Sequence, residues 1–152
     1  MLESRQIKSR LTQAIRKSLQ EGKRSGKGLT DPRYTTTISK LGKISSRASG
    51  LRGQLKVSGS RNLIKRFKLS PSSRPPHNPP GGLHIQVVRG QGGVLPHAFV
   101  NRAGLVFERT GRSRLPIRHL NTVSLAGAWS RVSAKVEAAI SHHLEKNLEA
   151  II

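Results

Sequence analysis

Apolar residues recur at three- and four-residue spacing over residues 2–20, which is the period of an amphipathic helix. The apolar positions of this stretch are Leu2, Ile7, Leu11, Ala14, Ile15 and Leu19. Three glycines, Gly22, Gly26 and Gly28, follow within eight residues of the stretch. Because glycine is a poor helix former, we expect the first helix to end near residue 20.

A second helical pattern runs from about Ser124 to the C-terminus, and Thr122 or Ser124 is expected to cap it. Its apolar positions form one continuous stripe: Trp129, Val132, Val136, Ile140, Leu144, Leu148 and Ile151. Such a stripe is typical of a helix that buries one face. We expect His142 to face solvent and His143 to lie at the edge of the stripe.

Between these helices the pattern is that of short strands. Alternating apolar and polar residues predict a β-hairpin over 51–69 with its turn at 57–61. Residues 83–109 predict two or three further strands, with a tight turn at 101–104. Residues 34–38 could add one short strand.

Three stretches lack such periodicity. Residues 22–50 are rich in Gly, Ser, Thr and Lys, residues 70–82 hold five prolines, and residues 110–121 form a basic loop. Proline cannot donate to a strand ladder, so 70–82 is predicted to be an extended loop. The fold class expected is α+β, in one domain over 1–152. In it an antiparallel β-sheet carries an N-terminal helix, a long C-terminal amphipathic helix and long basic loops.

The net charge of the chain says more about its function than the rest of its composition does. There are 28 Lys and Arg against 7 Asp and Glu, a formal net charge of +21. The segment from Ala126 onward is neutral, so the first 125 residues carry the whole excess. This favours polyanionic partners such as nucleic acid or acidic protein surfaces. Since only 34% of the residues are hydrophobic, we expect oligomerisation to supply part of the stability.

Several classes of function find little support in the residues. The glycine run 22–28 has the wrong spacing for a phosphate-binding loop, and the six histidines form no metal signature. Between Asp31 and Glu137 the only acidic residue is Glu108, which leaves few candidates for acid–base chemistry. There are no cysteines, and no apolar run approaches a membrane span. We therefore expect a protein that is not an enzyme, with no cofactor, metal, membrane or small-molecule substrate.

Two basic clusters are the candidate contact sites for subunits or DNA. They consist of Arg61, Lys65, Arg66 and Lys68, and of Arg109, Arg112 and Arg114. With few aromatic residues, phosphate contact without base recognition is the expected mode, and Tyr34 is the one ring placed to stack. Docking on acidic protein surfaces and a merely solvated basic face are the alternatives. Glu108 could pair with the arginines that follow it, within the chain or between subunits.

The stretch from Val94 to Ile117 reads Val-Leu-Pro-His-Ala-Phe-Val-Asn-Arg-Ala-Gly-Leu-Val-Phe-Glu-Arg-Thr-Gly-Arg-Ser-Arg-Leu-Pro-Ile. It resembles the lambda-like prophage minor tail protein Z family. In that family a Pro-x-Ala-Phe-Val segment leads into Val-Phe-Glu-Arg-x-Gly-x-x-Arg-Leu-Pro-Ile. The resemblance is tight over 94–117 and loose over about 10–150.

The resemblance implies a structural virion protein, a tail-completion or neck subunit at the head-proximal end of a long phage tail. It implies a ring, expected to be a hexamer, that contacts neighbouring neck, tail-terminator or tail-tube proteins and is assembled in the host cytoplasm. Phage DNA in the lumen would be a further partner. A basic protein that binds nucleic-acid phosphates without sequence specificity is the alternative. Within the motif, Pro96, Phe99, Phe107 and Pro116 are expected to form the turn and core, and Trp129 is expected to bury the last helix.

Overall fold

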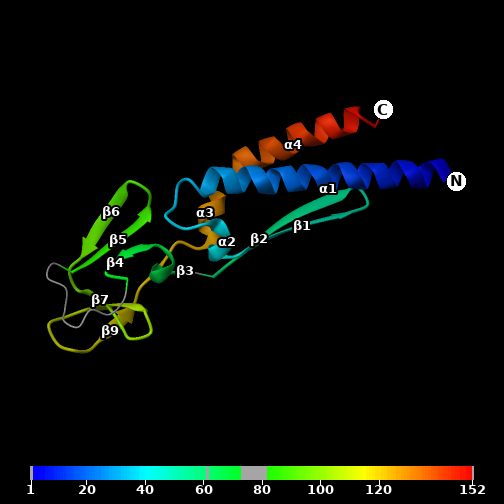
Figure 1. The fold of residues 1–152 in the computed structure, drawn as a ribbon. Helices are drawn as coiled ribbons and strands as arrows, with labels where there is room; N and C mark the ends of the chain where they lie inside the picture. Colours follow the sequence, from blue (N-terminus) through cyan, green and yellow to red (C-terminus); the bar gives the residue numbers. More distant parts are fainter. Residues whose placement is uncertain (1, 61, 73–81, 152) are drawn as a thin grey trace. The chain divides into compact units, whose positions relative to one another are not determined.

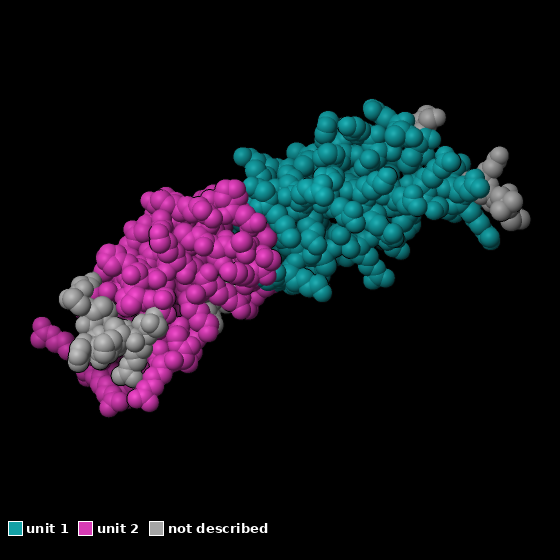
Figure 2. All heavy atoms as spheres, in the orientation of Figure 1, with its two compact units in different colours: residues 1–30, 42–58, 126–152 teal, residues 31–41, 59–125 magenta. Residues whose placement is uncertain are grey.

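A computed structural model of the chain describes residues 2–60, 62–72 and 82–151. It has an N-terminal helix, antiparallel strands and a C-terminal helix, so the predicted α+β class is confirmed. The chain divides into two compact units, which Figure 2 colours separately. Unit 1 comprises Met1–Thr30, Gly42–Ser58 and Ala126–Ile152, and unit 2 comprises Asp31–Leu41 and Gly59–Leu125.

Unit 1 is built around two helices that lie side by side and run antiparallel, α1 (Leu2–Thr30) and α4 (Ser133–Glu149) (Figure 1). The prediction that the first helix ends near residue 20 is wrong, because α1 continues through the glycines to Thr30. The buried positions of α1 explain why. Small side chains recur there every fourth residue: Ala14, Ser18, Gly22, Gly26 and Thr30.

This stripe of small residues forms the surface on which α4 and the short helix α3 (Leu125–Ser130) pack. A Cβ atom built on Gly26 would overlap the Trp129 ring, and one built on Gly22 would overlap Ile140. Small residues at four-residue spacing line up along one helix face, so they let the backbones approach closely. The Oγ of Ser18 also accepts a 3.0 Å hydrogen bond from the amide of Asn147.

The C-terminal stripe is present, although it belongs to two helices and not to one. Trp129, Val132 and Val136 are buried, and the later members of the stripe are half-buried. The break falls at residues 131–132, where the Val132 N–H donates to the Trp129 carbonyl oxygen at 2.9 Å. His142 is exposed and His143 is half-buried, as predicted.

The hairpin of unit 1 differs from the predicted one. Strand β1 (Lys43–Ser49) pairs with β2 (Arg52–Ser58), so the turn lies at Gly50 and Leu51 and not at 57–61. Gly50 has a φ of 57° at the first turn position, which suits a two-residue type II′ turn. The residues of 22–50 that were predicted to be loop therefore include a helix end and a whole strand.

The β1–β2 hairpin lies along α1 (Figure 1). Gly53 faces the helix, and a Cβ there would lie 2.6 Å from Ile15 Cγ2. The Oγ1 of Thr12 donates a 2.9 Å hydrogen bond to the Gly50 carbonyl oxygen, which ties the turn to the helix. The hairpin thus packs by one face, and its other face is left to solvent.

Unit 2 contains two three-stranded antiparallel sheets. The first is β4 (Lys68–Ser70), β5 (Leu83–Val88) and β6 (Gln91–Leu95); the second is β7 (Ala98–Val100), β8 (Val106–Arg109) and β9 (Ile117–His119). Shorter elements are α2 (Ile38–Leu41), β3 (Asn62–Leu63), the 3-10 turn η1 (Ile64–Arg66) and β10 (Asn121–Thr122), which pairs with β3. The core of the unit is formed by Ile64, Leu83, Ala98, Val100 and Val106, with Leu69, Ile85, Leu95 and Leu120 around them.

Residues 83–109 form four strands, β5 to β8, where two or three were predicted, and the tight turn at 101–104 is confirmed. The Gly104 N–H donates to the Asn101 carbonyl oxygen at 3.0 Å, and Gly104 has a φ of 74°. The basic loop predicted over 110–121 is shorter than expected, because β9 begins at Ile117 and β10 at Asn121. The short strand predicted over 34–38 is absent: Tyr34 forms an isolated bridge with Val88, and Ile38 begins α2. Tyr34 is 2% exposed, so its ring belongs to the core and is not available for stacking.

The predicted proline-rich loop over 70–82 falls largely on residues 73–81, which lie outside the described residues. Within the described ranges, no helix is long and apolar enough to cross a membrane.

The last two glycines of α1, Gly26 and Gly28, offer a test of the helix contact. We expect Gly26→Ala to lower the free energy of unfolding by about 1–3 kcal/mol, because its Cβ must displace the Trp129 ring. Gly28 has nothing within 4 Å of its Cβ position, so Gly28→Ala is the control. It should raise the free energy of unfolding by about 1 kcal/mol, the helix-propensity difference. Urea unfolding followed by circular dichroism measures both, and equal stabilisation by both variants would contradict the close contact.

Candidate functional site

The motif segment 94–117 begins at the end of β6 and includes all of β7 and β8. The inner face of the β7–β8–β9 sheet supplies Ala98, Val100 and Val106 to the core, each at most 6% exposed. Alternate residues of a strand point to opposite faces, so the residues between them face outward. These outward residues are the part of the motif that is available to a partner.

An aromatic row crosses the outer face of this sheet. Phe99, Phe107 and His119 are cross-strand neighbours, with ring centroids 6.1 Å apart for the first pair and 5.1 Å apart for the second. The Arg109 guanidinium lies over the Phe99 ring, 5.6 Å from its centroid. This arrangement makes a continuous row of rings with one cation stacked on it.

Phe99 and Phe107 were expected in the core, but both are half-buried on the outer face. Pro96 and Pro116, expected to help form the turn and core of the motif, are exposed, and Pro96 lies in the turn between β6 and β7. The cause is the two-residue period of a strand, because Val100 and Val106 pair with each other and occupy the inner positions. Trp129 is buried at 7% exposure, as expected.

The loop after β8 displays the second basic cluster. Its ends are joined through Thr110, whose N–H and Oγ1 both donate to the Pro116 carbonyl oxygen, at 3.3 Å and 3.0 Å. Arg112, Arg114 and Leu115 are all exposed between these ends, and Leu115 is 65% exposed. The loop therefore presents cations and an apolar side chain together.

Glu108 forms an ion pair within the chain. Its Oε2 accepts a 2.8 Å hydrogen bond from Arg118 Nε, and Arg118 Nη2 lies 2.6 Å from the same oxygen, across the β8–β9 pair. The predicted partners were the arginines immediately downstream, and the pairing register explains the difference, because Arg118 lies directly opposite Glu108. Among the described residues Arg112 and Arg114 are in no ion pair.

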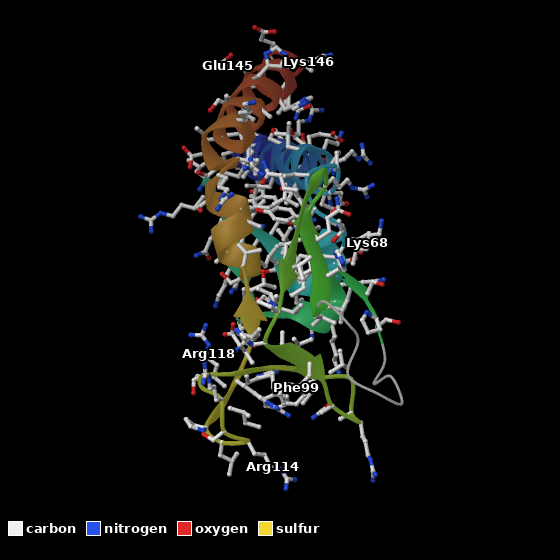
Figure 3. The ribbon with its side chains drawn as sticks, turned by 90° about the vertical axis from the view of Figure 1, so that its left-hand side faces the viewer. Lys68, Phe99, Arg114, Arg118, Glu145 and Lys146 are labelled. Atoms are coloured by element: carbon white, nitrogen blue, oxygen red, sulfur yellow. The ribbon has the colours of Figure 1, made fainter. Side chains whose placement is uncertain are left out.

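The other basic cluster lies elsewhere in unit 2. Lys65 and Arg66 are exposed on the 3-10 turn, and Arg66 Nη1 donates to the Lys40 carbonyl oxygen at 2.7 Å. Lys68 is exposed on β4, and Figure 3 shows it well apart from Arg114. Arg61 lies outside the described residues. The structure does not bring the two predicted clusters into one site.

A shallow pocket of about 350 Å³ lies over the outer face of the β4–β5–β6 sheet. Its lining residues are Lys68, Ser70, His84, Ile85, Gln86, Gly92, Gly93 and Val94. The lining contains no carboxylate, and no group of three metal-ligating side chains occurs within the described part of the chain. The pocket offers hydrogen bonds and one cation, without a paired acid and base.

Two features of the site escaped the sequence analysis. The outer aromatic row differs from the prediction, which places Phe99 and Phe107 in the core. The stripe of small residues on α1 differs from the prediction, which ends the helix at these glycines. The four-residue spacing from Ala14 to Thr30 is the signal that could have revealed the stripe.

Comparison of the chain with models of protein families, with curated proteins and with solved structures finds no match.

The Glu108–Arg118 pair is testable by a double-mutant cycle with Glu108→Gln and Arg118→Gln. We expect a coupling free energy of about 0.3–1 kcal/mol, because the Arg118 side chain is 65% exposed and the pair is partly screened. The matched cycle of Glu108→Gln with Arg112→Gln should give a coupling near zero. Urea unfolding measures both cycles, and a larger coupling with Arg112 would show that the loop folds back onto the strand.

Proposed function

We propose that this chain is a structural assembly protein that works by contact and not by catalysis. More particularly, we propose a ring-forming tail-completion or neck subunit at the head-proximal end of a phage tail, required to join tail and head. The motif of residues 94–117 supports the second step, and its exposure in the structure supports the first. The expected location is the virion, after assembly in the host cytoplasm.

One observation carries the proposal: the motif displays its apolar side chains. Val94 is 43% exposed, Leu115 is 65% exposed and Ile117 is 39% exposed. These are three of the six large hydrophobic side chains exposed among the described residues. Exposed apolar groups that cluster in one segment are typical of a surface that a partner covers.

The charged neighbours of these residues suit a protein partner. Arg109 lies directly opposite Ile117 in the β8–β9 pair, and Arg112 and Arg114 precede Leu115 in the loop. Protein interfaces typically have an apolar centre and are enriched in arginine and aromatic residues, which matches the aromatic row and its flanking loop. A second copy of the chain or an acidic face of a neighbouring ring protein would satisfy both features.

The second candidate function is binding of nucleic-acid phosphates without sequence specificity. The exposed cations of the chain favour this function. It gives no role, however, to the exposed apolar side chains of the motif. In a ring around DNA the two functions would be carried out by different faces of one subunit.

Charge reversal in the 110–116 loop tests the contact role. Particles carrying Arg112→Glu with Arg114→Glu should show separate full heads and tails in electron micrographs, because the loop would repel an acidic partner. Arg131→Glu with Lys135→Glu, on exposed positions of the C-terminal segment, is the control of equal charge change and should leave particle yield normal. Normal joining in the loop variant would contradict the role.

The exposed leucine of the same loop tests self-association. Leu115→Ser should leave the free energy of unfolding within about 0.5 kcal/mol, because the side chain is already in water. It should weaken the oligomer, which native mass spectrometry of the purified chain measures as a shift towards monomer. If the Leu115→Ser oligomer is as stable as the wild type, the subunit contact lies elsewhere. A wild-type chain that is monomeric and absent from virions would contradict the proposed function as a whole.

A further inference from the structure

The outer face of the β1–β2 hairpin is the most regular charged surface among the described residues. Alternation places every second residue of each strand on this face, away from α1. The eight outward residues are Lys43, Ser45, Arg47 and Ser49 on β1, and Arg52, Gln54, Lys56 and Ser58 on β2. All eight are exposed, whereas Ile44, on the inner face, is 7% exposed.

The cross-strand register arranges these residues as a checkerboard. Each directly opposed pair joins one cation to one neutral polar residue: Lys43 with Ser58, Ser45 with Lys56, Arg47 with Gln54 and Ser49 with Arg52. The cations therefore alternate between the strands along the ribbon. Successive cations are about 6.7 Å apart along its length, two residues of strand rise. No cation faces another directly, so their mutual repulsion is reduced.

Nothing acidic neutralises this surface from within its own segment. The chain contains no Asp or Glu from residue 32 to residue 107. Within the described part of the chain, none of the four cations is in an ion pair. The hydroxyls of Ser45 and Ser58 donate to the carbonyl oxygens of Lys56 and Lys43 at 3.5 Å and 3.4 Å, which are long distances for hydrogen bonds.

We propose that this hairpin face binds the phosphate backbone of double-stranded DNA without reading its sequence. The side chains suit phosphate, because lysine and arginine supply charge and serine and glutamine supply hydrogen-bond donors. A two-stranded ribbon also has dimensions that the major groove of B-DNA admits. The inference concerns a face that lies outside the 94–117 motif, and it does not depend on ring formation.

The composition of the face favours DNA over an acidic protein. A protein interface needs an apolar, water-excluding centre, and none of the eight outward positions is apolar. Interfaces with DNA are more polar, wetter and more positively charged. Leu51, 69% exposed, is the one large apolar residue of the hairpin in water, and it lies at the turn, outside the checkerboard.

The hairpin is also held as a rigid ribbon, which suits a contact surface. Its inner face packs on α1 through Gly53, and its turn is tied to Thr12. Because the cations project from paired strands, few backbone degrees of freedom are lost on binding. A disordered basic tail of equal charge would lose more backbone conformational freedom on binding.

The test compares two variants of the purified full chain with equal loss of charge. Variant one is Arg47→Gln, Arg52→Gln and Lys56→Gln, on the outer face of the hairpin. Variant two is Arg131→Gln, Lys135→Gln and Lys146→Gln, all exposed on the neutral C-terminal segment. The probe is a short DNA duplex of arbitrary sequence, with binding measured by fluorescence anisotropy between about 0.05 and 0.2 M salt.

We expect the hairpin variant to lose about tenfold or more in affinity, with the slope of log K against log salt falling by about 2–3, close to 0.9 for each phosphate contact removed. The C-terminal variant should keep the wild-type slope, and a second duplex of different sequence should bind equally well. Gln54→Glu, which adds one carboxylate to the checkerboard and removes no cation, should also weaken binding. Outward polar substitutions in a strand barely change folding, and thermal unfolding of each variant verifies this.

Equal losses in the two triple variants would overturn the proposal, because net charge alone would then explain binding. An unchanged slope in the hairpin variant would overturn it as well. If polyglutamate competes with the duplex at equal charge concentration, the result would indicate that the hairpin face binds an acidic protein surface and not DNA. These DNA-binding measurements do not test formation of the oligomer or the joining of heads and tails. A result that contradicts DNA binding by the hairpin therefore leaves the proposed assembly function standing, and the reverse also holds.

Discussion

Unit 1 depends on the close contact between α1 and the C-terminal helices. Five small residues, from Ala14 to Thr30, leave a smooth face on α1, and bulky side chains such as Trp129 and Ile140 fill it. The contact buries apolar surface where the chain has little of it, because only 34% of its residues are hydrophobic. Glycine lowers helix propensity, so the continuation of α1 through Gly22, Gly26 and Gly28 to Thr30 depends on packing.

The same helix positions the β1–β2 hairpin. Gly53 and the Thr12 side chain bring the ribbon against α1 by its inner face. The strand period then places all four cations of the ribbon, together with four neutral polar residues, on its outward face. A single constraint, close backbone approach at small residues, therefore produces both the buried interior of unit 1 and its regular cationic surface.

Unit 2 obtains its core from two sheets whose inner faces supply valines, leucines and an isoleucine. Because these residues fill the core, the aromatic residues of the motif remain outside, where the Arg109 side chain stacks on Phe99. The motif surface thus combines aromatic, apolar and arginine side chains, while the hairpin surface has only polar and cationic ones. This difference in composition is the physical basis for assigning a protein partner to one and DNA to the other.

The sequence by itself determined the fold class, the presence of strands over residues 83–109, the turn at 101–104 and the burial of Trp129. These features follow from local periodicity and turn residues, which act over a few positions. Only the tertiary structure decided how far α1 extends, which strands pair in the hairpin, and that Phe99 and Phe107 face outward. The partner of Glu108 was decided in the same way, by the register that places Arg118 opposite it. Each of these depends on contacts that local periodicity does not specify. Packing of Trp129 on Gly26 lets α1 continue through its glycines, and pairing of Val100 with Val106 determines which face of the motif is buried.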